Sequence, residues 1–284
     1  MSHIHHECEL ERHIVEQLAA AGWLVGKSAD YDAARALFPD DVLGWLAESQ
    51  PQAMNGAGTR HVVLDRLVKQ LENKVDGGTV NLLRYGFAVA GGGTLVMSQG
   101  LPEDDRNETV IARYAANRLR VVPQLRYSLD KADEIDLAFF INGIPVATVE
   151  LKTDFTQSVQ AAMQQYRMDR KPERKSGGLE PLLTFKRGAV VHFAMSDSDI
   201  RMTTKLAGDS TFFLPFNRGN DGAAGNPPGD NNSYPVSYLW EHVLQKDNWL
   251  HIFHRFVLQE RKEGQDVNGK TYFKEGLIFP RFHQ

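Results

Sequence analysis

The sequence has a single cysteine, Cys8, so it cannot form an internal disulfide. Small secreted domains depend on a framework of disulfides, and this chain is therefore not of that class. The sequence also lacks a signal peptide and any apolar run of about 18 residues, the length that a membrane-spanning helix requires. We therefore expect a cytoplasmic protein that has no membrane partner.

An excess of positive charge is missing as well. The chain has 32 Lys and Arg against 36 Asp and Glu, which gives a net charge of −4. A protein that binds nucleic acid over its whole surface needs a basic surface, so any contact with DNA must be local or shared with partner subunits. The 284 residues and 42% hydrophobic content are enough to form one large core.

Two apolar runs, 135–141 and 144–151, flank an Asn-Gly pair, which is the strongest short signal for a β-hairpin. Apolar side chains occupy the odd positions of both runs. Because successive side chains of a strand point to opposite faces, this pattern predicts two antiparallel strands whose odd-numbered residues share one face. Asp136, Glu150 and Lys152 lie toward the ends of these runs.

The length of the turn decides where the two carboxylates lie. A two-residue turn would pair Ile141 with Ile144 and would place Asp136 and Glu150 on opposite faces, where they could not bind one metal ion. A three-residue loop with a left-handed glycine would pair Phe140 with Ile144 instead, and the two carboxylates would then share a face. We therefore predict the three-residue loop.

Asp136, Glu150 and Lys152 are the residue types that metal-assisted cleavage of a phosphodiester requires. Two carboxylates can hold a hard cation such as Mg²⁺, and a lysine beside them can orient a water molecule or offset charge on the phosphate. The same pattern also fits an amphipathic hairpin with charges at its solvated ends, because this spacing is common by chance.

Several short segments, taken in order, resemble the amino-terminal nuclease domain of the R (restriction and translocation) subunit of type I restriction enzymes. They are 107–124, Asp136 with Glu150-Leu-Lys152, 162–170, 214–219, 225–227, 238–245 and 278–284. That family belongs to the PD-(D/E)XK nuclease superfamily. The resemblance thus implies an α/β fold with a mixed central sheet flanked by helices, and a Mg²⁺-dependent endonuclease. It also implies that the partners are double-stranded DNA and the methyltransferase and specificity subunits.

The resemblance implies catalytic roles for Asp136, Glu150 and Lys152. It further implies a glutamate on the first helix that approaches the metal, and the matching segment is 9–23. Glu11 fits best and Glu7 is the second choice, while a solvated helix face is the alternative for both. The metal ligands would then be Asp136, Glu150 and Glu11.

Many relatives carry a glutamine and a tyrosine four residues apart on the helix that follows the lysine. This chain has no Gln-x-x-x-Tyr, and Gln164 and Tyr166 are the nearest candidates. The same helix ends in a group of cations that could contact the phosphate backbone of DNA, unless they are only a solvated basic helix end. These cations are Arg167, Arg170, Lys171, Arg174 and Lys175.

Residues 264–271 match the phosphate-binding P-loop pattern, but their flanks do not fit a P-loop. A polar segment precedes the match where a buried strand is needed, and Gly276 and Pro280 interrupt the helix that should follow. We therefore assign no nucleotide binding to this match. Earlier in the chain, 82–89 and 94–98 have the composition of strands.

The carboxyl end resembles the entry to a superfamily 2 helicase motor, in which Gln284 would be the glutamine that reads adenine. The resemblance implies an endonuclease domain over 1–260, a linker and the start of the motor over 261–284, and ATP use only by the motor that follows. Two alternatives remain. A docking module with a nuclease fold would keep its task without Lys152, and a free-standing nuclease would cut branched or terminal DNA alone.

Overall fold

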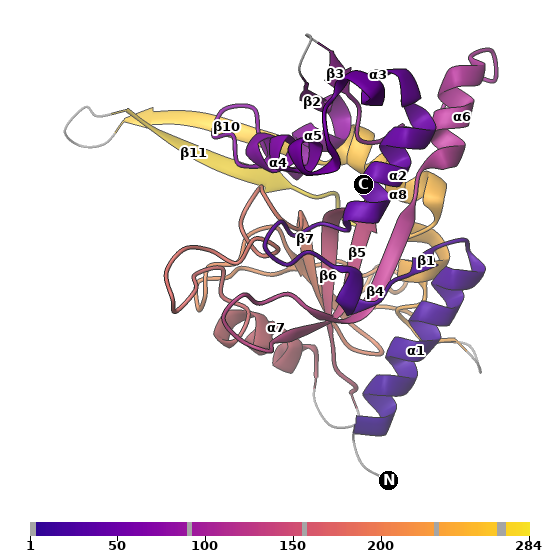
Figure 1. Cartoon of the computed structure of the whole chain (residues 1–284). Coiled ribbons are helices and arrows are strands. Elements are labelled where there is room, and N and C mark those ends of the chain that lie inside the picture. The colour runs from indigo at the N-terminus through magenta and orange to yellow at the C-terminus, as the bar shows by residue number, and fades with distance from the viewer. Residues whose placement is uncertain (1–3, 90–92, 155–157, 230–232, 266–270) are drawn as a thin grey trace.

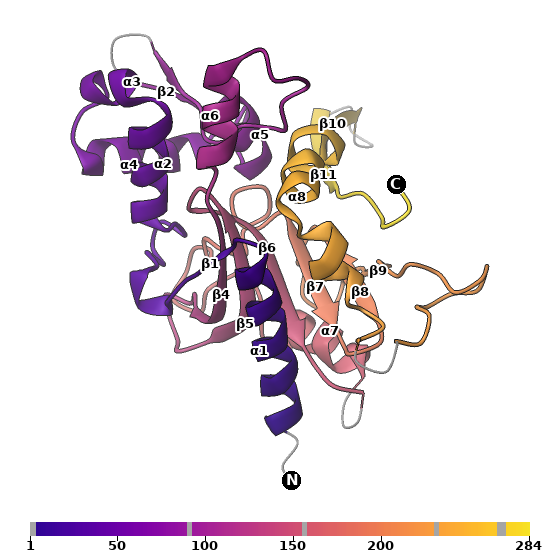
Figure 2. The same ribbon diagram turned by 90° about the vertical axis from the view of Figure 1, so that its right-hand side faces the viewer.

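The computed structural model describes residues 4–89, 93–154, 158–229, 233–265 and 271–284. A seven-stranded mixed sheet forms its centre, and helices pack on both faces (Figures 1 and 2). The mixed central sheet flanked by helices that the sequence predicted is confirmed. No helix among the described residues is both long and apolar enough to cross a membrane.

The strands of the central sheet follow the order β1-β4-β5-β6-β7-β8-β9. Neighbours pair antiparallel except for β1 with β4 and β6 with β7, which are parallel. The strands are β1 (Leu24–Val25), β4 (Leu119–Arg126), β5 (Glu134–Ile141), β6 (Ile144–Leu151), β7 (Val191–Met195), β8 (Ile200–Thr203) and β9 (Leu214–Pro215). Two further pairs lie outside it, namely β2 (Phe87–Ala88) with β3 (Thr94–Leu95), and β10 (Leu258–Gln265) with β11 (Thr271–Ile278).

The α-helices fall into two groups around the sheet. The first group consists of the helices before β4, together with α8 near the carboxyl end, and it supplies most of the helical cover (Figure 2). The second is α7, which provides the crossover between the parallel strands β6 and β7. Their bounds are α1 (Ile4–Ala20), α2 (Pro39–Ser49), α3 (Pro51–Gly56), α4 (Arg60–Leu71), α5 (Thr79–Tyr85), α6 (Glu108–Ala116), α7 (Val159–Met168) and α8 (Lys246–His251). A 3₁₀ turn, η1 (Ser28–Asp30), and two π-helical turns, η2 (Leu239–Val243) and η3 (Ile252–Phe256), complete the chain.

Two separate hydrophobic cores follow most of the predicted alternation of side chains. Leu137, Phe139, Ala147 and Val149 lie in the larger core with side chains from α1, α2, α4 and α8. The exceptions are Ile135, which lies in the smaller core, and the even-numbered Ile144 and Val146, which lie in the larger one near the turn. The even-numbered Ala138 and Phe140 lie in the smaller core with Tyr166 of α7. Burial on both faces makes β5 and β6 the centre of the molecule.

The register of this hairpin differs from the one predicted, although its consequence is the same. The turn is the tight one, since Ile141 pairs with Ile144 and Asn142 and Gly143 both have positive φ, of 50° and 79°. A bulge between Phe139 and Phe140 then shifts the pairing by one residue. Beyond the bulge, even-numbered residues of β5 lie opposite even-numbered residues of β6. The prediction of a three-residue loop was therefore wrong, but the prediction that Asp136 and Glu150 share a face was correct.

The predicted boundary between residues 260 and 261 falls inside β10, and the division of the chain into domains stays a prediction. The β10–β11 ribbon projects from the body in Figure 1, but Leu277 and Phe279 return to the larger core. The ring centroid of Phe279 lies 6.0 Å from that of Phe193 in β7. Leu277 and Phe279 therefore pack against the same core as the central sheet.

The two described ends of the P-loop match lie on the two-stranded ribbon. Gly264 belongs to β10 and pairs with Tyr272 of β11, and Thr271 begins β11, while 266–270 lie outside the described residues. A P-loop opens a helix, whereas the segment after this match is an antiparallel strand. The absence of a nucleotide site here stays a prediction.

One strand prediction was wrong. Residues 79–85 form the helix α5, and only Phe87–Ala88 of the predicted strand 82–89 is extended. Gly78 and Gly86 bound this helix with φ of 102° and 69°, a conformation that other residues rarely adopt. The apolar run was long enough for a strand, and the two glycines mark the ends of a short helix instead.

Candidate functional site

The central hairpin brings Asp136 and Glu150 together. Leu137 pairs with Val149, and the same register places Asp136 opposite Glu150. The backbone N–H of Leu151 donates a hydrogen bond of 2.6 Å to Asp136 Oδ2, which joins the carboxylate to the end of β6. Asp136 is half-buried and Glu150 is fully buried, so the side chain of Asp136 is open to solvent in part while that of Glu150 lies in the core.

Glu150 is a charged residue in the interior, and its pKa reflects that. Burial raises the pKa of its carboxyl group to about 8, and the nearby Asp136 acts in the same direction, while Arg170 opposes both. Arg170 Nε lies 2.5 Å from Glu150 Oε1. The other oxygen, Oε2, is buried without a hydrogen-bond partner.

Lys152 follows β6 and is held at the same end of the strand. Its backbone N–H donates to Met195 O, and its Nζ donates a hydrogen bond of 2.8 Å to Leu151 O. The Nζ also lies 3.5 Å from Glu7 Oε2 of α1. The ammonium group is therefore largely buried and directed by two fixed oxygens.

Both candidate glutamates of α1 reach this region, but they contact different groups. Glu7, the second choice, is the partner of Lys152. Glu11, the first choice, accepts a hydrogen bond from Gln124, and burial together with the nearby Asp136 raises the pKa of its carboxyl group to about 7. The helix thus presents one carboxylate toward the lysine and another toward Asp136, with one turn between them.

Gln164 and Tyr166 do not come together. Tyr166 is fully buried and its hydroxyl group lies 2.8 Å from Thr148 Oγ1, whereas Gln164 is exposed. Two positions that are two residues apart project from opposite sides of a helix. Thr148 also lies 2.7 Å from Nδ1 of the buried His192, so Tyr166 belongs to a polar network under the sheet.

The basic group predicted to contact DNA is mostly engaged within the chain. Arg167 bonds to Thr211 O, Arg174 bonds to Asp130, and Arg170 is buried against Glu150. Of the five cations in this group, only Lys171 and Lys175 are exposed. The assignment of Arg170 is therefore corrected: with a side chain only 9% exposed, it is a core ion pair and not a surface contact.

Among the described residues, no three His, Cys, Asp or Glu side chains form a group arranged to hold a metal ion. The predicted set of Asp136, Glu150 and Glu11 is therefore not assembled as a compact trio, because Gln124 holds Glu11 and Arg170 holds one oxygen of Glu150. The opposed pair of Asp136 and Glu150 does fit a hard cation. A buried carboxylate oxygen without a partner beside a second carboxylate is costly unless positive charge offsets it.

A comparison with protein families identifies the family of this chain. The family described as "Type I restriction enzyme R protein N terminus" matches residues 6–211 of the 284. The chain belongs to this family. A search among curated proteins gave no match. The matched region contains α1, the central hairpin and α7, so all the site residues described above lie within the family's domain.

Gln124 is a residue of this R-subunit domain that the sequence analysis did not single out for the site. It is omitted from the pairing of β4 with β5, where Pro123 pairs with Leu137 and Leu125 pairs with Ile135, and its φ is 47°. The register of β4 with β5 is the same on both sides of Gln124, so no residue is inserted there. The left-handed backbone at Gln124 accompanies a side chain whose Nε2 donates a hydrogen bond to Glu11.

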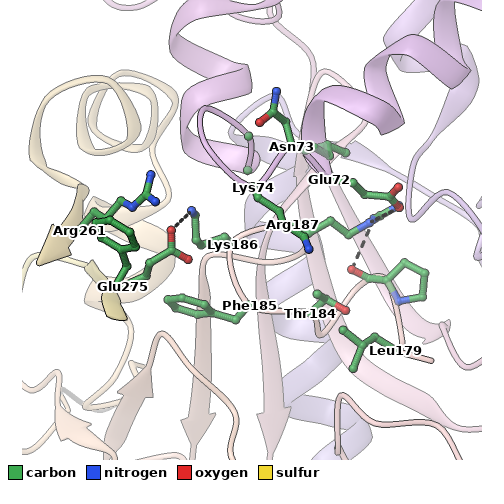
Figure 3. A pocket seen from close by; sticks show the side chains of 15 residues that line it. Glu72, Asn73, Lys74, Leu179, Thr184, Phe185, Lys186, Arg187, Arg261 and Glu275 are labelled. Atoms are coloured by element: carbon green, nitrogen blue, oxygen red, sulfur yellow. Dashed lines mark hydrogen bonds and ion pairs between the residues drawn. The ribbon is translucent and has the colours of Figure 1, made fainter. Parts of the chain in front are cut away.

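A cavity of about 730 Å³ lies away from these carboxylates, between α4, the segment before β7 and the β10–β11 ribbon (Figure 3). Lys186 in this cavity pairs with Glu275 at 2.8 Å, and Arg187 lies 3.6 Å from Glu72. None of Asp136, Glu150 and Lys152 lines it. We therefore place the candidate site of this family member at the central hairpin and not in the cavity.

Proposed function

We propose that this R-subunit domain is a Mg²⁺-dependent DNA endonuclease module that acts on phosphodiester bonds within a type I restriction complex. The single observation that carries the proposal is Glu150, a fully buried carboxylate opposite Asp136 with one unpartnered oxygen. Structural carboxylates in a core are normally paired on both oxygens, so this one favours a function for the site.

The residues fit distinct roles in hydrolysis. Asp136 and Glu150 would hold the cation, which supplies positive charge beside the phosphate when it is bound. Lys152 would hold a water molecule or a phosphate oxygen near the carboxylates, since its Nζ is already directed by Leu151 O and Glu7. Glu11 would assist through its position beside Asp136.

The partners and the source of specificity follow from the family. Double-stranded DNA would be the substrate, and methyltransferase and specificity subunits would select unmodified sites. The net charge of −4 supports this division, because an acidic domain gains little non-specific affinity for DNA and needs partners to deliver it. ATP would be used by a motor and not by the residues described here.

The test uses the purified chain and supercoiled plasmid with Mg²⁺ or Mn²⁺. Asp136→Ala, Glu150→Ala and Lys152→Ala should each reduce single-turnover cleavage by about 100-fold or more, as expected for the loss of a group that acts in the reaction. The matched control is Lys69→Ala, which removes an exposed cation of α4 that belongs to neither the hairpin nor the basic group. In an assembled complex, the three variants should keep ATP hydrolysis and translocation.

Two outcomes would contradict the proposal. Cleavage by Lys152→Ala at the rate of the parent would remove the lysine from the reaction. A parent chain that binds no divalent cation and cuts no DNA in the assembled complex would favour the docking module, in which the nuclease fold only joins the motor to the methyltransferase complex.

A further inference from the structure

Arg170 follows α7 directly after its C-cap residue Asp169, and its side chain contacts two strands of the sheet and the residue that follows a third. Its Nε lies 2.5 Å from Glu150 Oε1 of β6, and its Nη2 donates a hydrogen bond of 2.6 Å to Glu134 O at the start of β5. Its guanidinium carbon lies 5.9 Å from the ring centroid of Tyr127, which follows β4. Two hydrogen bonds in the plane of the guanidinium and one aromatic ring against its face therefore fix the Arg170 side chain.

The helix that carries Arg170 is fixed as well. The backbone N–H of Arg170 donates to Gln165 O, which ties the residue to the last turn of α7. One turn earlier, the Tyr166 hydroxyl lies 2.8 Å from Thr148 Oγ1, two residues before Glu150 in β6. The position of the guanidinium is consequently set by the docking of the whole helix.

We propose that Arg170 is a positioning residue for the metal site, which holds Glu150 through Oε1 so that Oε2 stays free for a divalent cation. This inference rests on the proposed function. A planar guanidinium that donates to two acceptors at once fixes a carboxylate more firmly than a lysine can. Cation binding then does not include the entropic cost of ordering a mobile carboxylate.

The arrangement differs from an ordinary core ion pair in one respect. An ion pair that serves stability alone would satisfy both oxygens of the carboxylate, because an unpaired buried oxygen is unfavourable. Here Arg170 uses its second donor on Glu134 O and leaves Glu150 Oε2 without a partner. The Arg170 guanidinium thus orients the Glu150 carboxylate but pairs with only one of its two oxygens.

The experiment measures Mn²⁺ binding by titration calorimetry with the full chain. Arg170→Met should weaken binding by about 10- to 100-fold, the usual effect of removing a group that orients a metal ligand. Arg170→Lys keeps a cation but cannot reach Glu150 and Glu134 O together, and it should weaken binding less. The control Arg174→Met removes a neighbouring arginine that pairs with Asp130, and it should bind Mn²⁺ like the parent.

Circular dichroism of each variant checks folding, and Arg170→Lys decides the matter if Arg170→Met does not fold. Unchanged or tighter Mn²⁺ binding in a folded Arg170 variant, beside a parent that binds, would overturn the positioning role and leave the proposed function standing. If the parent binds no Mn²⁺, and the Glu150→Ala variant gives the same titration as the parent, the proposed function and this inference would both be overturned.

Discussion

His192 should make the stability of the fold depend on pH, and the size of the effect follows from its surroundings. The side chain is only 1% exposed, its Nδ1 lies 2.7 Å from Thr148 Oγ1, and burial lowers its pKa to about 3 from an ordinary value of 6.5. The folded state therefore keeps the imidazole neutral under conditions in which the unfolded chain takes up a proton.

The sign follows from proton binding. Below a pH of about 6.5 the unfolded state binds the proton and the folded state does not, so the free energy of unfolding falls as the pH is lowered toward 3. Between pH 7 and pH 5 the two pKa values lower the free energy of unfolding by about 2 kcal/mol, because only the unfolded state is stabilised by taking up the proton.

Urea unfolding of the parent and of His192→Asn at both pH values tests this reasoning. The variant keeps a polar atom near the place of Nδ1, and it should be less stable at both pH values but lose about 2 kcal/mol less than the parent between them. The control His242→Gln removes an exposed imidazole instead. Equal losses in parent and His192→Asn would refute a neutral, buried His192.

Three further predictions concern other residues. Glu11→Gln should raise the free energy of unfolding at pH 8 by roughly 1–2 kcal/mol and have no such effect near pH 4, because the raised pKa of about 7 makes only the charged form unfavourable; chemical unfolding at both pH values measures it. Asn142→Ala should cost about 2–4 kcal/mol in urea unfolding, because this fully buried side chain bonds to Arg118 N, Met97 O and Asn117 Oδ1. Calorimetric titration with ATP and Mg²⁺ should give no saturable binding at submillimolar ATP, because the two described ends of the P-loop match lie on a ribbon; a saturating heat would contradict this.

The sequence predicted the central hairpin because its signal is local. Alternating apolar residues and an Asn-Gly pair specify two strands and a turn, and both are present. The register could not be predicted, because the bulge between Phe139 and Phe140 depends on how both faces of the sheet are packed. The argument from metal chemistry still selected the correct shared face for Asp136 and Glu150.

The contacts of Arg170 lay beyond sequence reasoning for a different reason. A group of cations at a helix end gives no sign of which member turns inward, and the ion pair with Glu150 joins residues on separate elements. The same holds for α1, where Glu7 and Glu11 differ by one turn and only the tertiary structure shows that Lys152 meets the first and Gln124 the second.

The aromatic contacts of Phe279 give the end of the chain a mechanical link to the sheet. Its ring lies within 6.0–6.1 Å, centroid to centroid, of Phe193, Trp249 and Phe253, and Phe193 pairs directly with Val149 in the strand that carries Glu150. A close-packed interior transmits strain because its side chains have little room to yield. Tension applied beyond Phe279 would therefore load the central strands directly, whereas a flexible tether would absorb it.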